Sequence, residues 1–330
     1  MNYERLTTLV SSAALAPKPT LWQHLIMLIK SSRPPGWTFG PILYGIGVIH
    51  SGMAPKTLGA LVVCLSQTAT LSFPLCIVVF GINDVYDYET DIRNPRKSAT
   101  SLEGTILPPA HHDFVHRAAV TASLITIATS VLPSTFSPAT SLCNGTVRTY
   151  APMLATTALV ALCWMYSAPP TRLKEVPIVD SVSNGLIVFL SWFLGYASCR
   201  ALAGDRGLGW NMADMPSKGY VLGLVTSSVH ALGAAADIDA DLAAGQRTVG
   251  TVLGSQGCAA LGVVAYGLAL LTESLASIFG VYLIGGLSVM LSVCVAPTPT
   301  WVHYAFKIIV IWTVGMSFLW FGVKLSKRGA

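Results

Sequence analysis

Apolar stretches of about 20 residues recur along the whole chain, and each is long enough to cross a hydrocarbon core of about 30 Å. Their punctuation by Gly, Pro and charged residues predicts membrane-spanning helices near residues 37–53, 58–82, 114–135, 149–166, 178–203, 217–236, 257–275, 277–296 and 301–324. The composition agrees, because only 11% of the residues are charged, against about 25% in soluble proteins. The sequence therefore predicts an all-α membrane protein with about nine transmembrane helices, and we expect residues 1–330 to form a single transmembrane domain.

Loop charges and the N-terminal segment predict the orientation in the membrane. Residues 21–32 alternate apolar and polar side chains at helical spacing, which predicts an interfacial helix, so residues 1–33 are expected to be a cytosolic segment with that helix. Loops on the N-terminal side carry slightly more Lys and Arg, which places the N-terminus in the cytosol. We expect a multi-pass protein of the endoplasmic reticulum in a eukaryote, or of the plasma membrane otherwise. The formal charge of +5 predicts no nucleic-acid partner, but membrane lipids surround the chain.

Acidic residues are concentrated in two short windows, residues 84–91 and 237–241, which hold seven of the 15 Asp and Glu. In the first window Asp84, Asp87 and Asp91 are spaced to share one helical face. In the second, Asp237 and Asp241 lie four residues apart and also share a face. Both windows follow even-numbered spans and are therefore expected on the same membrane face, where they can meet.

Two rows of carboxylates with no cation between them would repel each other strongly at low dielectric, so we predict that metal ions lie between them. Oxygen ligands favour a hard cation, and Mg²⁺ is commonly bound by one or two carboxylates together with water and substrate phosphates. Nearby basic residues are available for the diphosphate oxygens that the metal does not reach: Arg96, Lys97, Arg172, Lys174 and Arg247. The expected substrate is a diphosphate with an apolar remainder. Glu89 and Asp239 face away and are expected to pair with loop cations such as Arg93.

At these residues the sequence resembles the UbiA superfamily of intramembrane prenyltransferases. The NDxxDxxxD motif of that family is present as Asn83, Asp84, Asp87 and Asp91. Its second motif, DxxxD followed by Gly and a basic residue, is similar to Asp237, Asp241, Gly245 and Arg247.

Two further stretches resemble the same family. Residues 166–174 are similar to its YxxP-type loop, which brings a lysine to the diphosphate, here Lys174. Arg33 is similar to a basic residue at the start of the family's first helix and is expected to reach the site.

The resemblance implies nine helices around a central cavity that opens to the cytosol, and Mg²⁺-assisted ionisation of an allylic isoprenyl diphosphate. It implies that the five motif aspartates bind metal and serve as the catalytic groups. It also implies a diphosphate-binding set: Asn83, Lys174, Arg172, Arg96, Lys97, Arg247 and Arg33. The allylic cation is then transferred to an aromatic or lipid/isoprenoid acceptor.

Two alternatives to transfer stay open. UbiA-type terpene cyclases carry out the same first step on geranylgeranyl or farnesyl diphosphate but close the cation into a cyclic terpene; transfer is favoured because transferases are more numerous in the superfamily. A transporter would use the carboxylates as an ion pathway, but it would hold them near the bilayer midplane.

Several other polar and aromatic residues have competing interpretations. We expect His230 to be a buried histidine bonded to a neighbouring helix, with a cavity-lining role as the alternative. Asp180 and Asn184 share a face, where Asn184 contacts the cavity or hydrogen-bonds between helices. Residues 111–116, rich in histidine, are expected to form a solvated loop. Five aromatic residues are candidates for cation stabilisation, although packing is favoured for each: Phe80, Trp164, Phe189, Trp192 and Tyr196.

Overall fold

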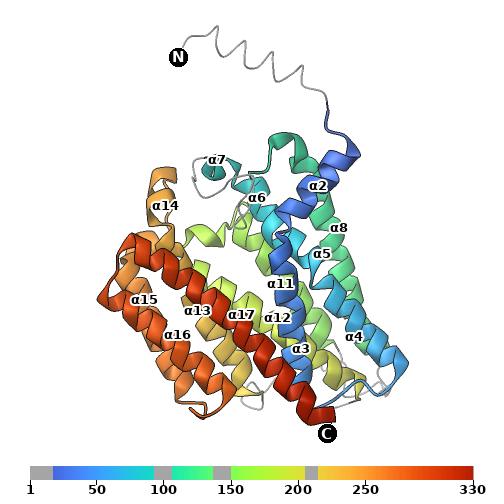
Figure 1. Cartoon of the computed structure of the whole chain (residues 1–330). Helices are drawn as coiled ribbons and strands as arrows, with labels where there is room; N and C mark the ends of the chain where they lie inside the picture. Colours follow the sequence, from blue (N-terminus) through green and yellow to red (C-terminus); the bar gives the residue numbers. More distant parts are fainter. Residues whose placement is uncertain (1–17, 93–105, 137–149, 205–214, 330) are drawn as a thin grey trace.

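The computed structural model describes residues 18–92, 106–136, 150–204 and 215–329, and these residues form a bundle of helices (Figure 1). The first half of the chain contributes the following helices: α2 (Leu21–Ser31), α3 (Phe39–His50), α4 (Leu58–Thr70), α5 (Phe73–Cys76), α6 (Ile82–Tyr86), α7 (Tyr88–Asp91), α8 (His112–Ser130), α9 (Leu132–Thr135) and α11 (Ala151–Ser167). The second half contributes α12 (Val179–Leu202), α13 (Ser217–Ala236), α14 (Ile238–Ala244), α15 (Val249–Leu270), α16 (Ile278–Val295) and α17 (Pro299–Gly329).

Seven helical segments in the described part of the chain are long and apolar enough to cross a membrane. They include a continuous run from α4 to α6 (Leu58–Tyr86) and another from residue 109 to the end of α9. The predicted span at 149–166 corresponds to α11, a shorter apolar helix of 17 residues, and the span at 37–53 corresponds to α3, which has 12. The helical membrane fold is as predicted. The predicted number of nine membrane-spanning helices is not confirmed, because α3 and α11 are shorter than the other seven segments.

The largest boundary error concerns the seventh predicted span, which we expected to begin at residue 257. Its helix, α15, begins at Val249 because the Thr248 side chain caps the helix by accepting from the Thr251 N–H. A kink at Gly254, whose φ is +67°, lies within this helix. Gly250 and Gly254 lie in these first turns, where glycine weakens the hydropathy signal of a helix.

Helix α12 lies at the centre of the bundle, between α11 and α13 and against α3 (Figure 1). In the most apolar 18 residues of α12, 67% of the residues are buried. The corresponding share in α17 is 11%, because α17 packs on the outside of the bundle. Helices α3 and α12 approach closely through glycine: a Cβ on Gly47 would lie 2.0 Å from the Trp192 carbonyl oxygen, and one on Gly195 would lie 2.0 Å from that of Tyr44. Small residues permit this spacing in membrane helix pairs.

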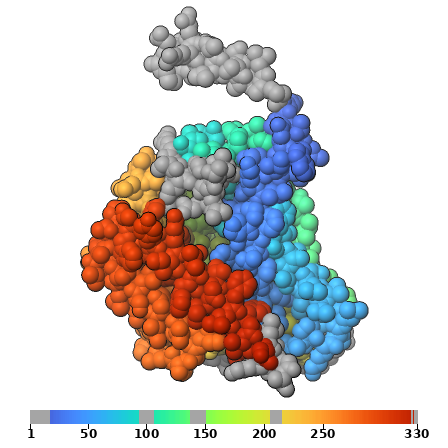
Figure 2. Space-filling view, in the orientation of Figure 1, coloured from blue at the N-terminus to red at the C-terminus, as the bar shows by residue number. Residues whose placement is uncertain are grey.

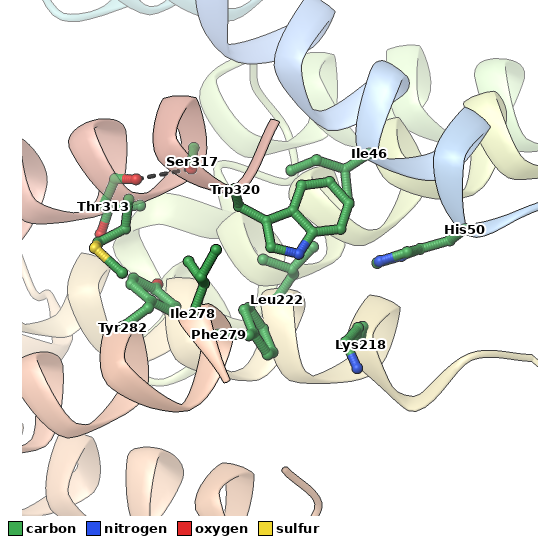
Figure 3. A pocket seen from close by; sticks show the side chains of 11 residues that line it. Ile46, His50, Lys218, Leu222, Ile278, Phe279, Tyr282, Thr313, Ser317 and Trp320 are labelled. Carbon is green, nitrogen blue, oxygen red and sulfur yellow. Dashed lines mark hydrogen bonds between the residues drawn. The ribbon is translucent and has the colours of Figure 1, made fainter. Parts of the chain in front are cut away.

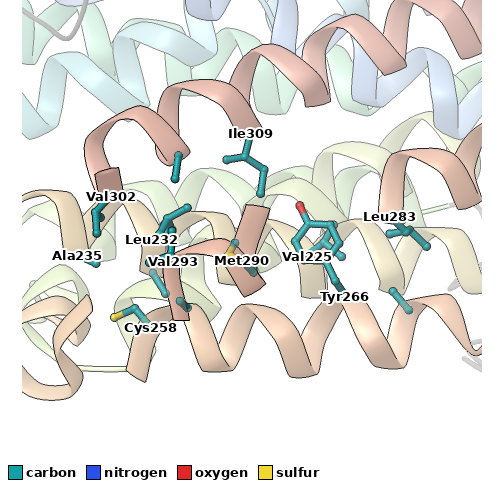
Figure 4. Packing of buried hydrophobic residues seen from close by; sticks show 14 of the residues in the cluster. Val225, Leu232, Ala235, Cys258, Tyr266, Leu283, Met290, Val293, Val302 and Ile309 are labelled. Atoms are coloured by element: carbon teal, nitrogen blue, oxygen red, sulfur yellow. The ribbon is translucent and has the colours of Figure 1, made fainter. Parts of the chain in front are cut away.

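The C-terminal helices α13, α15, α16 and α17 share one apolar core (Figure 4). Leu232 of α13, Met290 of α16 and Ile309 of α17 are fully buried in it. Figure 2 shows α17 (red) next to the N-terminal helices (blue) in the lower part of the view. Above this contact, yellow-green residues that lie deeper in the bundle are visible between them. The same orientation places α6, α7 and α14 at one end of the bundle (Figure 1).

The N-terminal helix α2 lies at this same end (Figure 1). Thr20 and Gln23 form a capping box at its start, which satisfies two otherwise unpaired backbone donors. Leu28 packs with Ile77 and Ile82, next to the first acidic window, while Trp22 on the opposite face is exposed. The predicted amphipathic helix is therefore present and is attached directly above the acidic segment.

Candidate functional site

The first acidic motif (Asn83, Asp84, Asp87 and Asp91) lies in a broken helix rather than in a continuous one. A π-helical turn, Ile77–Gly81, precedes α6, and Asp87 separates α6 from α7 with φ −103° and ψ 5°. Helical hydrogen bonds nevertheless cross the break, since the Asp87 N–H donates to Asn83 O at 2.9 Å and the Asp91 N–H to Asp87 O at 2.8 Å. π-turns are frequent at functional sites.

The predicted spacing of the carboxylates survives this irregularity. Asp84 is 0% exposed, Asp87 7% and Asp91 5%, whereas Glu89 is exposed as expected. Asn83 donates from Nδ2 to the Ser167 hydroxyl at 3.4 Å, which connects the motif to the end of α11. Three carboxylates buried together are costly unless they are neutralised.

Arg33 supplies part of that neutralisation from the N-terminal side. Its Nη2 lies 3.2 Å from Asp84 Oδ1, and its guanidinium stands 4.6 Å from the centre of the Phe80 ring. Arg33 adopts a left-handed backbone conformation with φ +51°, which a residue with a Cβ rarely occupies. The chain thus turns sharply between α2 and α3 in order to direct this side chain at the motif.

Two further cations come from the segment between α11 and α12, where Lys174 lies in the 3₁₀ turn η4 (Leu173–Glu175) and Arg172 directly precedes that turn. Lys174 is buried and forms an ion pair with Asp87. Arg172, also left-handed with φ +39°, lies 3.5 Å from Asp87 Oδ1 and forms a second ion pair with Glu175. Arg33, Arg172 and Lys174, which we expected as diphosphate ligands, therefore lie against carboxylates of the first motif, although they come from distant parts of the chain.

The second acidic motif (Asp237, Asp241, Gly245 and Arg247) follows α13. Asp237 ends that helix, the Asp241 N–H donates to Asp237 O at 2.9 Å, and Gly245 ends α14 with φ +71°, a conformation that glycine adopts without strain. The Thr248 hydroxyl donates to Asp241 Oδ2 at 2.9 Å. Arg247 is exposed at this end of the bundle.

The two motifs lie within electrostatic reach of one another through Lys174. Burial lowers the pKa of Lys174 to about 8, while the carboxylates of Glu175, Asp84 and Asp241 act in the opposite direction. Lys174 thus interacts electrostatically with one aspartate from each motif, Asp84 and Asp241. Asp239 is exposed and turned away, as expected.

Buried polar contacts hold the segments that carry these groups. Asp180, at the start of α12, is 0% exposed and accepts from the backbone N–H of Val249 through Oδ2 at 2.9 Å, which anchors the start of α15. Asn184 donates to Asp180 O within its own helix and also contacts the Tyr166 side chain of α11, so both residues of this pair make the expected contacts between helices. Sequence reasoning missed Thr248, although a threonine before an apolar run is a recognisable helix-start signal.

His230 lies between two neighbouring helices, as predicted. Its Nε2 is 2.9 Å from the Tyr166 hydroxyl of α11, and its Nδ1 is 3.0 Å from the Ser181 hydroxyl of α12. Both ring nitrogens are engaged, so this histidine links α13 to the helices on either side of η4.

The five aromatic candidates are all engaged in packing. Phe80 faces Arg33, and Trp164 donates to the Ser123 hydroxyl at 3.0 Å. The remaining three contact one another along α12, where Trp192 stacks on Tyr196 and meets Phe189 at a tilt.

The histidine-rich stretch differs from the solvated loop that we expected. His111 is 8% exposed, and its Nδ1 lies 3.0 Å from that of His24 in α2, whose ring stacks on Phe114. Attachment of α2 therefore buries His111, which a local pattern does not reveal. The predicted diphosphate ligands Arg96 and Lys97, and Arg93, lie outside the described residues.

The donor set of the site fits Mg²⁺ that is bound together with a substrate. Within the described ranges, no three His, Cys, Asp or Glu side chains converge into a complete metal site. Mg²⁺ needs only one or two carboxylates when phosphates and water supply its remaining ligands, and the motif carboxylates are hard oxygen donors with neither Cys nor His among them. The motif carboxylates are therefore ligands of the kind that Mg²⁺ takes when water or a phosphate fills its remaining positions.

Comparison with known proteins identifies relatives over most of the chain, although no protein-family model matches it. A lycopene elongase/hydratase of Haloferax volcanii is 32% identical over 255 residues, which cover 74% of this chain and 72% of that protein. A lycopene elongase/hydratase of Haloarcula japonica is 29% identical over 253 residues, covering 74% and 71%.

Solved structures show the same fold. A UbiA homologue from Aeropyrum pernix, solved in its apo form, superposes with a TM-score of 0.62 at 16% identity, over 90% of this chain and 99% of that one. A UbiA homologue from Archaeoglobus fulgidus bound to DMAPP and Mg²⁺ superposes with a TM-score of 0.54 at 16% identity, over 88% and 99%.

Proposed function

Since this chain belongs to the UbiA superfamily of intramembrane prenyltransferases, we propose that it transfers the prenyl group of an allylic isoprenyl diphosphate to the alkene end of a long isoprenoid acceptor, with Mg²⁺ as cofactor. Relatives named for lycopene elongation support an isoprenoid acceptor. A structural relative bound to DMAPP and Mg²⁺ supports the donor and the metal.

The convergence of three cations on the first acidic motif carries the proposal. Arg33, Arg172 and Lys174 come from two separate parts of the chain, yet all three pair with Asp84 or Asp87. Lys174 also interacts electrostatically with Asp241 of the second motif. A diphosphate needs such an alternation of carboxylates, which hold its metal, and cations, which bind its remaining oxygens.

The residues divide the work as follows. Lys174 and the two arginines bind diphosphate oxygens and orient the donor, and the motif carboxylates hold Mg²⁺, which neutralises the charge of the leaving diphosphate. The carbon–oxygen bond breaks with its electron pair on the diphosphate, the acceptor alkene supplies the electron pair of the new carbon–carbon bond, and the resulting cation loses a proton. The apolar bundle excludes water that would otherwise capture the allylic cation.

The test measures product formation in membranes that contain the full chain, supplied with dimethylallyl diphosphate, a linear polyene acceptor and Mg²⁺. We expect a prenylated acceptor, and we expect Asp84→Asn and Asp237→Asn each to reduce its formation to background. Asp113→Asn is the matched control, because the Asp113 side chain is 94% exposed on α8 and its Oδ2 lies 4.0 Å from Arg117 Nη2.

Two outcomes would reject the proposal. If Asp84→Asn and Asp237→Asn form product at the rate of the unmodified chain, these aspartates are not part of the active site. A cyclic hydrocarbon formed from geranylgeranyl or farnesyl diphosphate without any acceptor would replace transfer by cyclisation.

A further inference from the structure

A second site lies at the opposite end of the bundle from the acidic motifs, in a pocket between α3, α13, α16 and α17 (Figure 3). It encloses about 460 Å³, including the part open to the surroundings. Most of its wall is apolar, with Ile46, Leu222, Ile278, Phe279 and Met316 among the lining residues. This lining is suited to part of an apolar molecule.

One buried nitrogen atom in the wall of this pocket, His50 Nε2, lacks a hydrogen-bond partner among the residues that the structure describes. The indole N–H of Trp192 donates to His50 Nδ1 at 3.0 Å, so Nδ1 must be the acceptor and the proton of the neutral imidazole lies on Nε2. The ring points from α3 toward Trp320 (Figure 3), and the two rings meet edge to face with their centres 5.3 Å apart. The Nε2–H is therefore a donor without an oxygen or nitrogen acceptor in the described part of the chain.

The lysine among the lining residues is paired. Lys218 Nζ lies 2.9 Å and 3.0 Å from the two carboxylate oxygens of Glu273, whose side chain is only 5% exposed. Lys218 is therefore neutralised, and Lys324, whose Nζ stands 5.8 Å from the centre of the Trp320 ring, is not among the residues that line the pocket. The lining residues thus carry no unpaired charge for an anionic headgroup or a diphosphate. The fitting partner of His50 is an uncharged oxygen, such as a hydroxyl or a carbonyl.

The position of the pocket determines how long its ligand must be to reach the acidic motifs. Lys218 lies at the start of α13 and Asp237 directly after its end. These 19 residues rise roughly 29 Å at about 1.5 Å each, which matches the hydrocarbon thickness of about 30 Å. A molecule with one end at each site spans the apolar core.

We propose that this pocket binds the far end of the acceptor, and that the preferred acceptor is a membrane-spanning isoprenoid chain with an uncharged oxygen at that end. Its near end lies at the acidic motifs, and its far oxygen accepts a hydrogen bond from His50 Nε2. The inference rests on the proposed transfer to a long isoprenoid. It adds a recognition site that selects among such acceptors.

The test compares two linear polyene acceptors of equal length, one with a terminal hydroxyl and one without, in membranes with dimethylallyl diphosphate and Mg²⁺. We expect the hydroxylated acceptor to have a KM about 3- to 10-fold lower, which corresponds to one net hydrogen bond. His50→Phe should abolish this preference, and His50→Gln should restore part of it by returning an N–H donor. His116→Phe, the same change on α8 outside the pocket, should retain the full preference.

The ratio of the two KM values is measured within one preparation, so it does not depend on the fraction of folded enzyme. Equal KM values in the unmodified chain, or an unchanged ratio in His50→Phe, would overturn the inference while leaving transfer intact. Absence of product from both acceptors would instead reject the proposed function.

A second readout does not require turnover. Thr313→Cys introduces a thiol into the pocket wall, and the hydroxylated polyene should slow its alkylation by a membrane-permeant maleimide in vesicles of a single phospholipid. The hydrocarbon should protect it less. Equal alkylation rates with and without either polyene would show that bulk lipid fills the pocket and would overturn the inference.

Discussion

Burial and neighbouring carboxylates act on the pKa of Lys174 in opposite directions. Its side chain is buried, which favours the neutral amine, and it is surrounded by carboxylates, which favour the ammonium form. Burial outweighs the carboxylates and lowers its pKa to about 8. The proposed diphosphate ligand is therefore a cation whose charge depends on pH close to neutrality.

This balance predicts a pH dependence of diphosphate use. Below about pH 8 Lys174 is protonated and can bind the anionic substrate; above it the ammonium loses its proton, so kcat/KM for the diphosphate should fall as pH rises. Lys174→Arg should move this decline to higher pH, because a guanidinium stays charged. The measurement is kcat/KM from pH 6.5 to 9.5 for both proteins, and identical profiles would exclude Lys174 as the titrating group.

Helix contacts determine whether such residues are held in place. Asp87 pairs with η4, which immediately precedes α12, and α12 is positioned by its glycine contact with α3. Interiors are close-packed, so a methyl group has no room at such a crossing. The central helix pair should therefore be sensitive to the smallest possible substitution.

Gly195→Ala tests this sensitivity, because its Cβ would lie 2.0 Å from the Tyr44 carbonyl oxygen, a backbone atom that cannot rotate away. We expect a loss of about 1–3 kcal/mol in the free energy of unfolding, typical of overpacking. Gly267→Ala is the matched control, since nothing lies within 4 Å of its added Cβ in α15. Thermal unfolding in detergent should show a lower midpoint for Gly195→Ala alone, and equal midpoints would contradict the close contact.

At the scale of the whole molecule, the bundle has two chemically different ends. Both acidic motifs and their cations lie at one end, and the His50 pocket lies at the other (Figures 1 and 3). The loop charges predict that the acidic end faces the cytosol. The donor would then enter from the cytosolic side, while the acceptor is recognised at both faces of the membrane.

Cysteine labelling tests this orientation. Arg247 at the acidic end and Lys56 in the loop between α3 and α4 are both exposed, and they can be replaced singly by cysteine in a chain with Cys143→Ser and Cys294→Ser. In sealed vesicles, an impermeant maleimide should label Arg247→Cys only from the cytosolic face and Lys56→Cys only from the other face. Labelling of Arg247→Cys from the non-cytosolic face would invert the proposed topology.

Much of this architecture was predictable because its signals are local. Hydropathy located the membrane helices to within a few residues, except at α15. The spacing of Asp84, Asp87 and Asp91 predicted that they share a face from which Glu89 points away, and the structure buries these three and exposes Glu89. Such patterns depend on residues within one or two helical turns. Local periodicity is what a single sequence reports best.

Contacts between distant segments were decided only by the tertiary structure. The pairing of Arg33 with Asp84 and of Lys174 with Asp87 joins residues 51 and 87 positions apart, and the unmet donor of His50 arises only because Trp192, 142 residues away, occupies its other nitrogen. The sequence by itself determined that the chain spans a membrane and carries two acidic motifs, since burial of apolar runs and helical spacing are local properties. Which charges neutralise each other, and where a polar group is left to bind a ligand, followed only from packing the helices, because those energies depend on three-dimensional distance and not on position along the chain.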